Sequence, residues 1–581
     1  MFGKIIYISD NVADIEIQEG TPLVENLMNM HIIFEDDKKK ILGEVENVDQ
    51  KVMKVRFLGE FVNNKFINGI IRKPTLSANV RLITKEELDM VMGDDGISFV
   101  LGASPLYDDY PIKVSINELF SNHLAIFGNT GSGKSCGVAR LLQNLFYSKE
   151  FNPVKSNFLI FDAYGEYHNA FSAINQINPN YNFKFYTTNK LYPNNLLRIP
   201  LWLLNKDDFA LLLNAETHSQ LTIIEKMLKL VGVFTSTDER SKKYKNHLVA
   251  KAITSILYSS LAPTSKRNDI FSIVSSCPTP EFNLEVLVQG IGYQRRFKDC
   301  FRIDNMGNFS EGVLIGEYVS SFIMEEFELS ESIEKNYFTL DNLEDALNFA
   351  LISEGLLQNE KMYNEAITLK VRLHSLAKGD NKEYFNYPNY ISQNDYVASI
   401  VSTQTGKAQI INFNLEDIDD SLAKTITKIY TRILFDFTKK LPTRASIPFH
   451  VFLEEAHRYV QHDTDKFLLG YNIFERVAKE GRKYGLILNL ISQRPVELSD
   501  TVISQCSNFL IFKMNHPRDI EYIKKMLPNI NEEIVEKQKT LQPGVCVAFG
   551  KAFKIPMIVK MPLPNPAPHS SNCDVASIWN N

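Results

Sequence analysis

The stretch "LAIFGNTGSGKSC", residues 124–136, decides the fold of this 581-residue chain. An apolar run leads into Gly128, four further residues and then Gly133, Lys134 and Ser135, after which an amphipathic run begins. This strand, loop and helix order is that of a phosphate-binding loop. Its glycines let successive backbone N–H groups face a phosphate, and the helix start adds its dipole. We therefore predict that this loop binds ATP.

Two side chains of the loop carry specific expectations. Lys134 is expected to reach the β- and γ-phosphates, and the Ser135 hydroxyl is expected to bind Mg²⁺. ATP and Mg²⁺ are thus the expected cofactors, and the alternative of a glycine-rich turn without a ligand is disfavoured by the flanking pattern. The predicted nucleotide-binding residues of the loop are Gly128, Asn129, Thr130, Gly131, Ser132, Gly133, Lys134, Ser135 and Cys136.

A second stretch, "FHVFLEEAHRYV" at residues 449–460, ends an apolar run in two adjacent carboxylates. A phosphate loop needs a carboxylate on the metal side and a group that orients the attacking water. We predict that Glu454 faces Mg²⁺ and that Glu455 is the catalytic base; the alternative is a strand that runs into an exposed acidic turn. His457 and Arg458 are weaker candidates, because a histidine at this position more often packs.

The alternation of apolar runs and helical patterns along the chain predicts an α/β fold. Short, nearly continuous apolar runs such as "NFLIFDAYGEY", "GLILNLISQ" and "NFLIFKMN" are typical of strands buried on both faces of a parallel sheet, and helical patterns lie among them. We expect a RecA-like P-loop ATPase core with a mainly parallel sheet, a small N-terminal β-barrel and a helical insertion. The predicted segments are a β-barrel at 1–90, the first part of the core at 91–203, the helical insertion at 204–400, the second part of the core at 401–562, and an extended, unpacked C-terminal tail at 563–581.

Composition limits the class of protein. The chain has 63 Lys and Arg against 69 Asp and Glu, a net charge of −6, so it does not coat nucleic acid with its whole surface. Its six cysteines lack CxxC spacing and indicate neither a zinc site nor a disulfide framework. No apolar run reaches the ~20 residues that cross a bilayer, and no signal peptide precedes the first strands, so we expect a cytoplasmic protein without a membrane partner.

Several segments together resemble the HerA family, hexameric DNA-translocating ATPases related to FtsK. The matching segments, in order, are "HLAIFGNTGSGKS", "FDAYGEY", "FLEEAHR", "AKEGRKYGLILNLISQRP" and "TVISQCSNFLIFKMNHPRDIEYI". The resemblance implies that "FDAYGEY" brings Asp162, Gly165, Glu166 and Tyr167 to the nucleotide site; on chemistry alone, a plain turn with surface acids remains open. It also implies that Gln493 senses the γ-phosphate. One departure is Glu454, since aspartate is commoner at the metal-directed position.

The same resemblance implies an arginine finger in "EGRKYG". Arg482 is expected to reach the γ-phosphate bound by a neighbouring subunit, which requires an oligomer, most simply a hexameric ring. Arg476 and Lys479 are competing candidates. The alternative is that Arg482 and Lys483 only complement the dipole of a helix that ends there.

A ring reconciles the net charge with DNA binding, because a central channel concentrates cations around double-stranded DNA locally. Residues 457–466 and parts of the insertion are the candidate channel segments. Two functions remain open. One is a motor that translocates on or remodels duplex DNA with a partner nuclease, as HerA-like proteins do with NurA. The other is a nucleotide-dependent scaffold that activates a nuclease or an NAD-degrading effector in antiphage defence. A conjugative coupling ATPase is disfavoured, because membrane segments are missing from the sequence.

Overall fold

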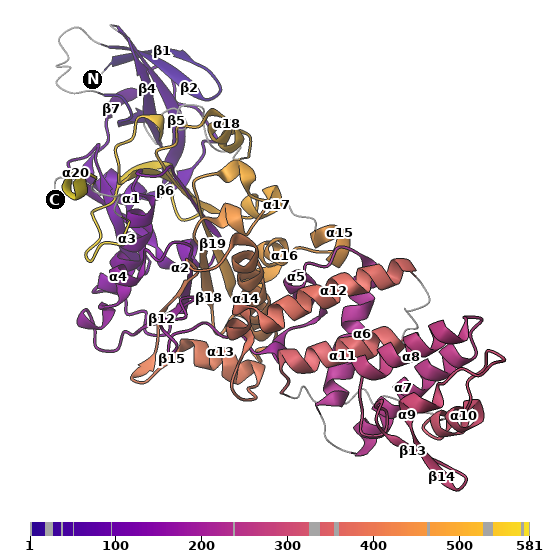
Figure 1. Ribbon diagram of the computed structural model, residues 1–581. Coiled ribbons are helices and arrows are strands. Elements are labelled where there is room, and N and C mark those ends of the chain that lie inside the picture. Colours follow the sequence, from indigo (N-terminus) through magenta and orange to yellow (C-terminus); the bar gives the residue numbers. More distant parts are fainter. Residues whose placement is uncertain are drawn as a thin grey trace. The chain divides into compact units, whose positions relative to one another are not determined.

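The protein is represented by a computed structural model. It describes residues 3–17, 27–36, 39–49, 51–93, 96–235, 239–324, 337–353, 360–461, 465–526, 538–570 and 575–579. Its contacts divide the chain into two units (Figure 1). The sheet unit comprises Met1–Asn195, Val397–Thr464 and Tyr471–Asn581, and the helical unit comprises Leu196–Tyr396 and Asp465–Gly470.

A large sheet forms the centre of the sheet unit, with the strand order β12-β17-β11-β18-β19-β10-β20-β21-β22-β8-β9. Neighbouring strands run parallel from β12 to β20 and antiparallel from β20 to β9. The predicted α/β class with a mainly parallel sheet is therefore confirmed. The strands are β8 (Ser98–Ser104), β9 (Tyr110–Ser115), β10 (Leu124–Phe127), β11 (Phe158–Asp162), β12 (Phe183–Thr187), β17 (Ile410–Asn414), β18 (Phe449–Leu453), β19 (Leu486–Ser492), β20 (Asn508–Phe512), β21 (Val545–Gly550) and β22 (Met557–Lys560).

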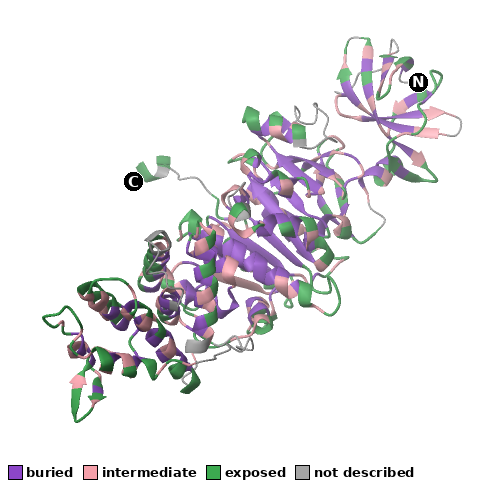
Figure 2. Cartoon of the chain, turned by 90° about the vertical axis from the view of Figure 1, so that its right-hand side faces the viewer, coloured by how far each residue is buried: buried purple, intermediate pink, exposed green. Residues whose placement is uncertain are grey.

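Helices cover both faces of this sheet, which explains why its central strands are apolar without alternation. Every residue of β10, β11, β18, β19 and β20 is buried (Figure 2). Helix α3 (Lys134–Tyr147) packs on one face, in a cluster that includes Ile126 and Ile160. Helix α14 (Asp420–Lys440) covers the other face, where the Tyr430 ring lies 5.8 Å from that of Phe161. Figure 1 shows these two helices on opposite sides of the strands.

The N-terminal strands form a separate antiparallel sheet with the order β1-β2-β5-β4-β3-β7, and β6 pairs with β5. Its edge strands β1 and β7 approach each other, so the sheet curls towards the predicted barrel. No hydrogen-bonded pairing of these two edges occurs within the described residues, so the sheet is a half-barrel rather than a closed one. The strands are β1 (Gly3–Ile8), β2 (Val12–Ile17), β3 (His31–Asp36), β4 (Lys39–Val48), β5 (Val52–Val62), β6 (Lys65–Asn68) and β7 (Asn79–Leu82).

The helical unit begins at Leu196 rather than at the predicted 204, and it gains Asp465–Gly470 from a distant part of the chain. Within this unit, helix α11 packs against α6, α7 and α12. Its elements are α5 (Lys206–Leu212), α6 (His218–Phe234), α7 (Glu239–Leu257), α8 (Pro263–Ser276), β13 (Leu287–Gly290), β14 (Tyr293–Arg296), α9 (Phe297–Cys300), α10 (Gly312–Ser320), α11 (Leu340–Ser353), α12 (Glu360–Lys378) and α15 (Asp465–Leu469).

Short elements complete the sheet unit. They are α1 (Lys85–Met92), α2 (Ile116–Phe120), α4 (His168–Phe171), α13 (Gln393–Val401, which starts in the helical unit), β15 (Ser402–Thr403), β16 (Gly406–Lys407), α16 (Ile473–Glu480), α17 (Asp500–Ile503), α18 (Pro517–Met526) and α20 (Val575–Trp579).

The C-terminal segment differs from the unpacked tail that the sequence predicts. Residues 563–570 lack regular structure, but they lie along α3 and are fixed by it. The buried Gln143 amide donates to Pro566 O (2.8 Å) and accepts from Asn565 N (2.9 Å), and the Tyr147 hydroxyl donates to Asn565 O. Farther on, His569 N donates to Glu166 O (2.8 Å). Backbone groups without secondary structure still need partners, and helix α3 supplies them here.

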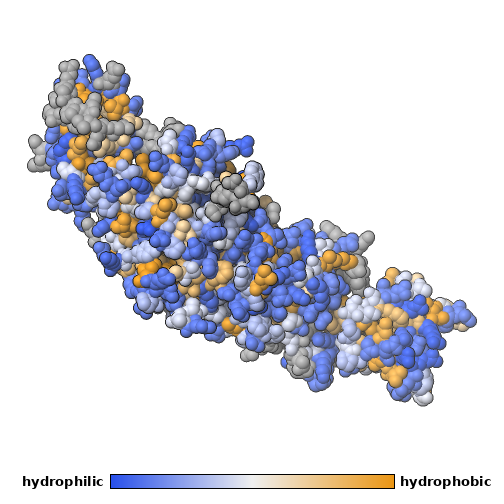
Figure 3. Space-filling model, turned by 60° about the vertical axis from the view of Figure 1, so that its left-hand side comes forward, coloured by the Kyte–Doolittle hydropathy of each residue, from blue (hydrophilic) through white to orange (hydrophobic). Residues whose placement is uncertain are grey.

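Among the described residues, no helix combines the length and apolar character that a membrane crossing requires. On the face of the molecule in Figure 3, hydrophilic residues predominate and hydrophobic ones form small, separate patches.

Candidate functional site

The phosphate loop lies at the carboxyl edge of the parallel strands, between β10 and α3. Gly128 N donates to Ser492 O (3.3 Å) and Asn129 N to Lys513 O (3.0 Å), so the loop is tied to the ends of the neighbouring strands β19 and β20. Gly133 has φ +90° and stands where a Cβ atom would lie 2.6 Å from Gly544 N, which leaves room only for glycine. It is also the N-cap of α3 and offers no side-chain cap, so the first N–H groups of the helix remain open to an anion.

Lys134 and Glu455 meet directly across the site. Lys134 Nζ lies 3.1 Å from Glu455 Oε1, and both side chains are only 7% exposed. Glu455 has φ +48° and ψ +48°, a left-handed conformation that is uncommon for a residue with a side chain. Strand β18 ends at Leu453, so the left-handed residue Glu455 comes directly after the strand end and Glu454. Such strain at a strand end is typical of functional sites.

Glu454 is a buried carboxyl group in an acidic neighbourhood. Burial raises the pKa of Glu454 well above its ordinary value. The negative charges of Asp162 and Glu166 add to this rise. Within the described part of the chain, its Oε2 atom has no hydrogen-bond partner. An orphaned, desolvated oxygen of this kind is expected where a ligand or a cation belongs.

Asp162 and Glu166 differ in how they are used. Both oxygens of Asp162 are occupied, because Oδ1 accepts from Glu166 N (3.0 Å) and Oδ2 accepts from Tyr167 N (2.9 Å) and Asn412 Nδ2 (3.0 Å). Burial raises the pKa of Glu166, and a hydrogen bond with Ser135 opposes that rise. Asp162 therefore holds the turn, and the turn presents Glu166 beside Ser135.

Gln493 and His457 make two further contacts at this edge of the sheet. Thr130 Oγ1 donates to Gln493 Oε1 (2.8 Å), which ties the phosphate loop to the end of β19. His457 Nδ1 lies 3.2 Å from Glu455 Oε2 and 3.1 Å from Ser492 Oγ. Burial lowers the pKa of His457, and the Glu455 charge opposes this. His457 was a weaker candidate in the sequence, where packing was the commoner expectation, and Ser492 was not singled out, although it directly precedes Gln493.

Arg482 lies away from this set, at the amino edge of the same sheet. It belongs to the short helical turn Gly481–Tyr484 that precedes β19, and its Nη1 donates to Asn122 Oδ1 (2.8 Å). Strand β19 separates it from Gln493, and seven strand residues span roughly 23 Å at about 3.3 Å each. The structure therefore does not bring Arg482 to the phosphate loop of its own chain.

Two of the other predicted cations, Arg476 and Arg458, have partners of their own. Arg476 lies over the rings of Phe435 (5.7 Å) and Tyr471 (5.5 Å). Arg458 pairs with Asp420 and lies 5.6 Å over the Tyr164 ring. Of the candidate channel segment 457–466, residues 462–464 and the side chains of 465 and 466 lie outside what the structure describes.

The residues present fit a nucleotide with a magnesium ion. The described residues contain no cluster of three or more His, Cys, Asp or Glu that would hold a metal by itself. Mg²⁺ commonly uses one or two protein groups, with phosphates and water as its other ligands. The buried, unpartnered Glu454 Oε2 fits such a ligand. Ser132 Oγ is a further buried atom without a hydrogen-bond partner in the described residues. Cys136, the last predicted loop residue, has a pKa raised by burial, with Ser570 of the C-terminal segment opposing the shift.

Comparisons with known proteins agree with this geometry. The family model of the helicase HerA central domain matches residues 99–276. The chain is 23% identical to the DNA double-strand break repair helicase HerA of Sulfolobus acidocaldarius, over 95% of this chain and 92% of that protein. It is 25% identical to the HerA helicase of Sulfurisphaera tokodaii, over 94% of this chain and 84% of that protein.

Solved structures with a similar arrangement include VirB4 of Thermoanaerobacter pseudethanolicus, with a TM-score of 0.47, 14% identity, and coverage of 81% of this chain and 97% of that one. The bacterial conjugative coupling protein TrwB has a TM-score of 0.43 and 12% identity, with coverage of 83% and 92%. The chain is thus similar to the helicase HerA in its central domain and to HerA sequences over most of their length.

Proposed function

We propose that this chain hydrolyses ATP to move on, or remodel, double-stranded DNA together with a partner nuclease or other effector. The observation that carries the proposal is the convergence at one sheet edge of Lys134, Glu455 and Gln493, each from a different strand end or loop. The curated relatives named as DNA repair helicases support the choice of DNA as the substrate.

The side chains suggest a division of work in hydrolysis. Lys134 would bind the β- and γ-phosphates, and Ser135 and Glu454 would hold Mg²⁺, which supplies positive charge to the phosphate oxygens. Glu455 would take the proton of the attacking water, and Gln493 would orient that water or contact the γ-phosphate. The 3.1 Å pair of Lys134 and Glu455 has to separate for both to act, so the described arrangement is a resting one.

Asp162 and His457 would position these groups rather than touch the nucleotide. Asp162 fixes the turn that carries Glu166, and His457 lies between Glu455 and Ser492. We infer that Glu166 acts next to Ser135, as an outer carboxylate of the metal site.

The position of Arg482 supports an assembly in a ring, most simply a hexamer. A guanidinium that lies a strand length from its own phosphate loop serves a phosphoryl group only in another subunit. Such contacts are head to tail, and they close into a ring when the rotation between subunits allows it. DNA would pass through the channel, where local cations suffice despite a net charge of −6.

The test is the rate of ATP hydrolysis with and without linear duplex DNA. We expect strong stimulation by DNA, and a rate lower by about 10²–10⁴-fold in Glu455→Gln with or without DNA. Glu317→Gln, an exposed carboxyl change in the helical unit, is the matched control and should behave like the unchanged protein. Turnover that ignores DNA while nucleotide drives assembly would instead favour the scaffold function, in which the ring activates a nuclease or an NAD-degrading effector.

A further inference from the structure

A large apolar cavity opens at the amino edge of the parallel sheet, opposite the nucleotide edge. Its volume is about 860 Å³. Its walls come from α2, the segment before β11, the loop before β18, and the first residues of β11, β18 and β19. The rings of Phe120, Phe158 and His450 form one wall, with the His450 ring 5.5 Å from Phe120 and 5.0 Å from Phe158. The aromatic wall favours a flat or otherwise apolar body.

The charges around this cavity are all of one sign. Lys155, Lys407 and Arg482 line it, and none of its described lining residues is Asp or Glu. Lys407 Nζ donates to Ser156 O, and burial lowers the pKa of this ammonium group to about 8. A cation that is desolvated without a nearby carboxylate gains from an anion.

His450 adds a second, independent indication of a ligand. It is 6% exposed, and its Nδ1 atom has no hydrogen-bond partner within the described residues. Burial lowers the pKa of His450 to about 3, so the ring is neutral near pH 7 and offers one nitrogen to a polar atom. Buried polar atoms are rarely left unpaired, and a bound molecule would supply the missing partner.

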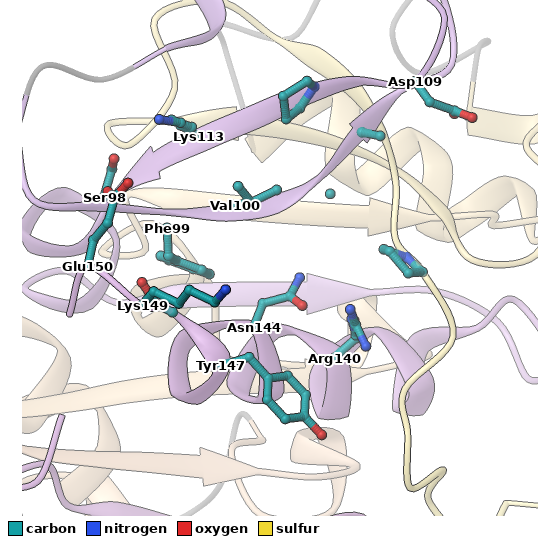
Figure 4. Close-up of a pocket in the computed structure, with 15 residues that line it drawn as sticks. Ser98, Phe99, Val100, Asp109, Lys113, Arg140, Asn144, Tyr147, Lys149 and Glu150 are labelled. Carbon is teal, nitrogen blue, oxygen red and sulfur yellow. The ribbon is translucent and has the colours of Figure 1, made fainter. Parts of the chain in front are cut away.

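A smaller cleft provides the contrast. It has a volume of about 400 Å³ and lies between the β8–β9 hairpin on one side and α3 with the residues after it on the other (Figure 4). Its cations Lys113, Arg140 and Lys149 stand with Asp109 and Glu150, so its charges are of both signs. It therefore lacks the one-sided charge of the larger cavity and serves as a control region.

We propose that the cavity at the amino edge binds a small amphipathic anion, with its apolar body against Phe120, Phe158 and His450 and its carboxylate, sulfonate or phosphate at Lys155 and Lys407. The site lies at the sheet edge opposite the predicted nucleotide site of the same chain. Phe158 is the first residue of β11, which ends at Asp162, and His450 is the second residue of β18, which ends next to Glu454. Arg482 also lines the cavity, so an effect on turnover follows if Arg482 has its proposed role; binding itself does not depend on that role.

The probe is the fluorescent aromatic sulfonate anilinonaphthalene sulfonate, titrated into the full-length protein without nucleotide. We expect saturable binding to one site per chain, and weaker binding of the uncharged analogue phenylnaphthylamine. The double variant Lys155→Ala/Lys407→Ala should raise the Kd for the sulfonate about tenfold or more, because two charge-assisted contacts are lost. It should leave the Kd of the uncharged analogue within about twofold.

Two further variants make the result decisive. Lys113→Ala/Lys149→Ala removes the same charge from the smaller cleft and should change the sulfonate Kd less than about twofold. Ser446→Trp, in the exposed loop at the cavity mouth, should block both probes by filling space. Equal losses in the two double variants, or no saturable binding by the unchanged protein, would overturn the proposal. Binding only to dissociated subunits would also overturn it, since a second copy of the chain would then cover the cavity. None of these measurements requires ATP hydrolysis, so they stand apart from the test of the motor function.

Discussion

Lys134 Nζ lies 3.1 Å from Glu455 Oε1, so the cation that should bind phosphate and the carboxylate that should activate water neutralise each other. Both side chains are almost fully buried, and a buried charge that loses its partner is costly. The pair therefore stabilises the site before nucleotide arrives. Binding of ATP must offer Lys134 a better anion than Glu455, which couples nucleotide binding to the release of the base.

The Glu455→Gln variant tests this coupling. An amide cannot take a proton from water, so kcat for ATP hydrolysis should fall by about 10²–10⁴-fold. The amide also holds Lys134 less strongly than a carboxylate does, so ATP should bind at least as tightly as to the unchanged protein. Steady-state hydrolysis and the binding of a fluorescent ATP analogue would measure the two effects. Retained hydrolysis would contradict the assignment of the base, and weaker ATP binding would contradict the competition.

Mixed assemblies test the role of Arg482. Lys134→Met should lose its own site, and Arg482→Ala should disable the site of its neighbour, so each variant alone should be inactive. In a random equal mixture, about a quarter of the sites combine an intact Lys134 with an intact Arg482 from the next subunit, so activity should return to roughly that level. The measurement is ATPase rate against mixing ratio. An inactive mixture, with subunit exchange shown by labelled chains, would rule out action between subunits.

Two buried histidines should make the fold sensitive to acid. Burial lowers the pKa of His123 to about 4 and that of His450 to about 3, whereas both take up protons near 6.5 when unfolded. Between pH 6.5 and about 4 the unfolded chain therefore binds more protons, and these groups reduce the stability as pH falls, by up to about 1.4 kcal/mol per pH unit each. Their stabilising effect is fully present above pH 6.5.

The variant His450→Phe isolates one of these contributions. Phenylalanine keeps the ring against Phe120 and Phe158 but cannot be protonated. Urea denaturation at pH 7 and pH 5 should show a smaller loss of stability in this variant than in the unchanged protein. Equal losses in the variant and in the unchanged protein would contradict the prediction.

Asp162 and Glu166 should respond differently to the loss of charge. Asp162→Asn keeps the size of the side chain but places an amide against backbone donors, so it should lower the free energy of unfolding by about 1–3 kcal/mol. Glu166→Gln should leave the stability nearly unchanged and raise the Mg²⁺ concentration needed for half-maximal hydrolysis. Thermal denaturation and magnesium titration would separate the two. A stable Asp162→Asn variant would contradict the positioning role.

The sequence predicted those parts of the site that follow from local pattern. The phosphate loop is recognised from its glycines and the segments on either side of them. Buried parallel strands are recognised because they are apolar throughout. The acidic pair Glu454 and Glu455 was found at a strand end for the same reason. The left-handed conformation of Glu455 was not predictable, because glutamate has no preference for it and only the surrounding fold imposes it.

The parts that the sequence missed depend on contacts between distant segments. The antiparallel extension from β20 to β9 pairs β22 with β8, segments over 400 residues apart, and no local pattern encodes that partner. The C-terminal segment was predicted to stay unpacked from its proline and serine content, yet Gln143 and Tyr147 of α3 provide partners for its backbone. Ser492 was missed because a serine beside a functional glutamine gives no signal of its own.

The length of β19 gives the subunit two unlike ends, with Gln493 at one and the turn that holds Arg482 at the other. Under the proposed mechanism, a row of subunits that stays open has a phosphate loop without an arginine at its first member and an arginine without a phosphate at its last. Every open row is therefore short of one working site, whatever its length, and closure restores it. The rate of ATP hydrolysis per subunit therefore falls as the number of open ends rises. A fall in this rate would report the breaking of a single ring.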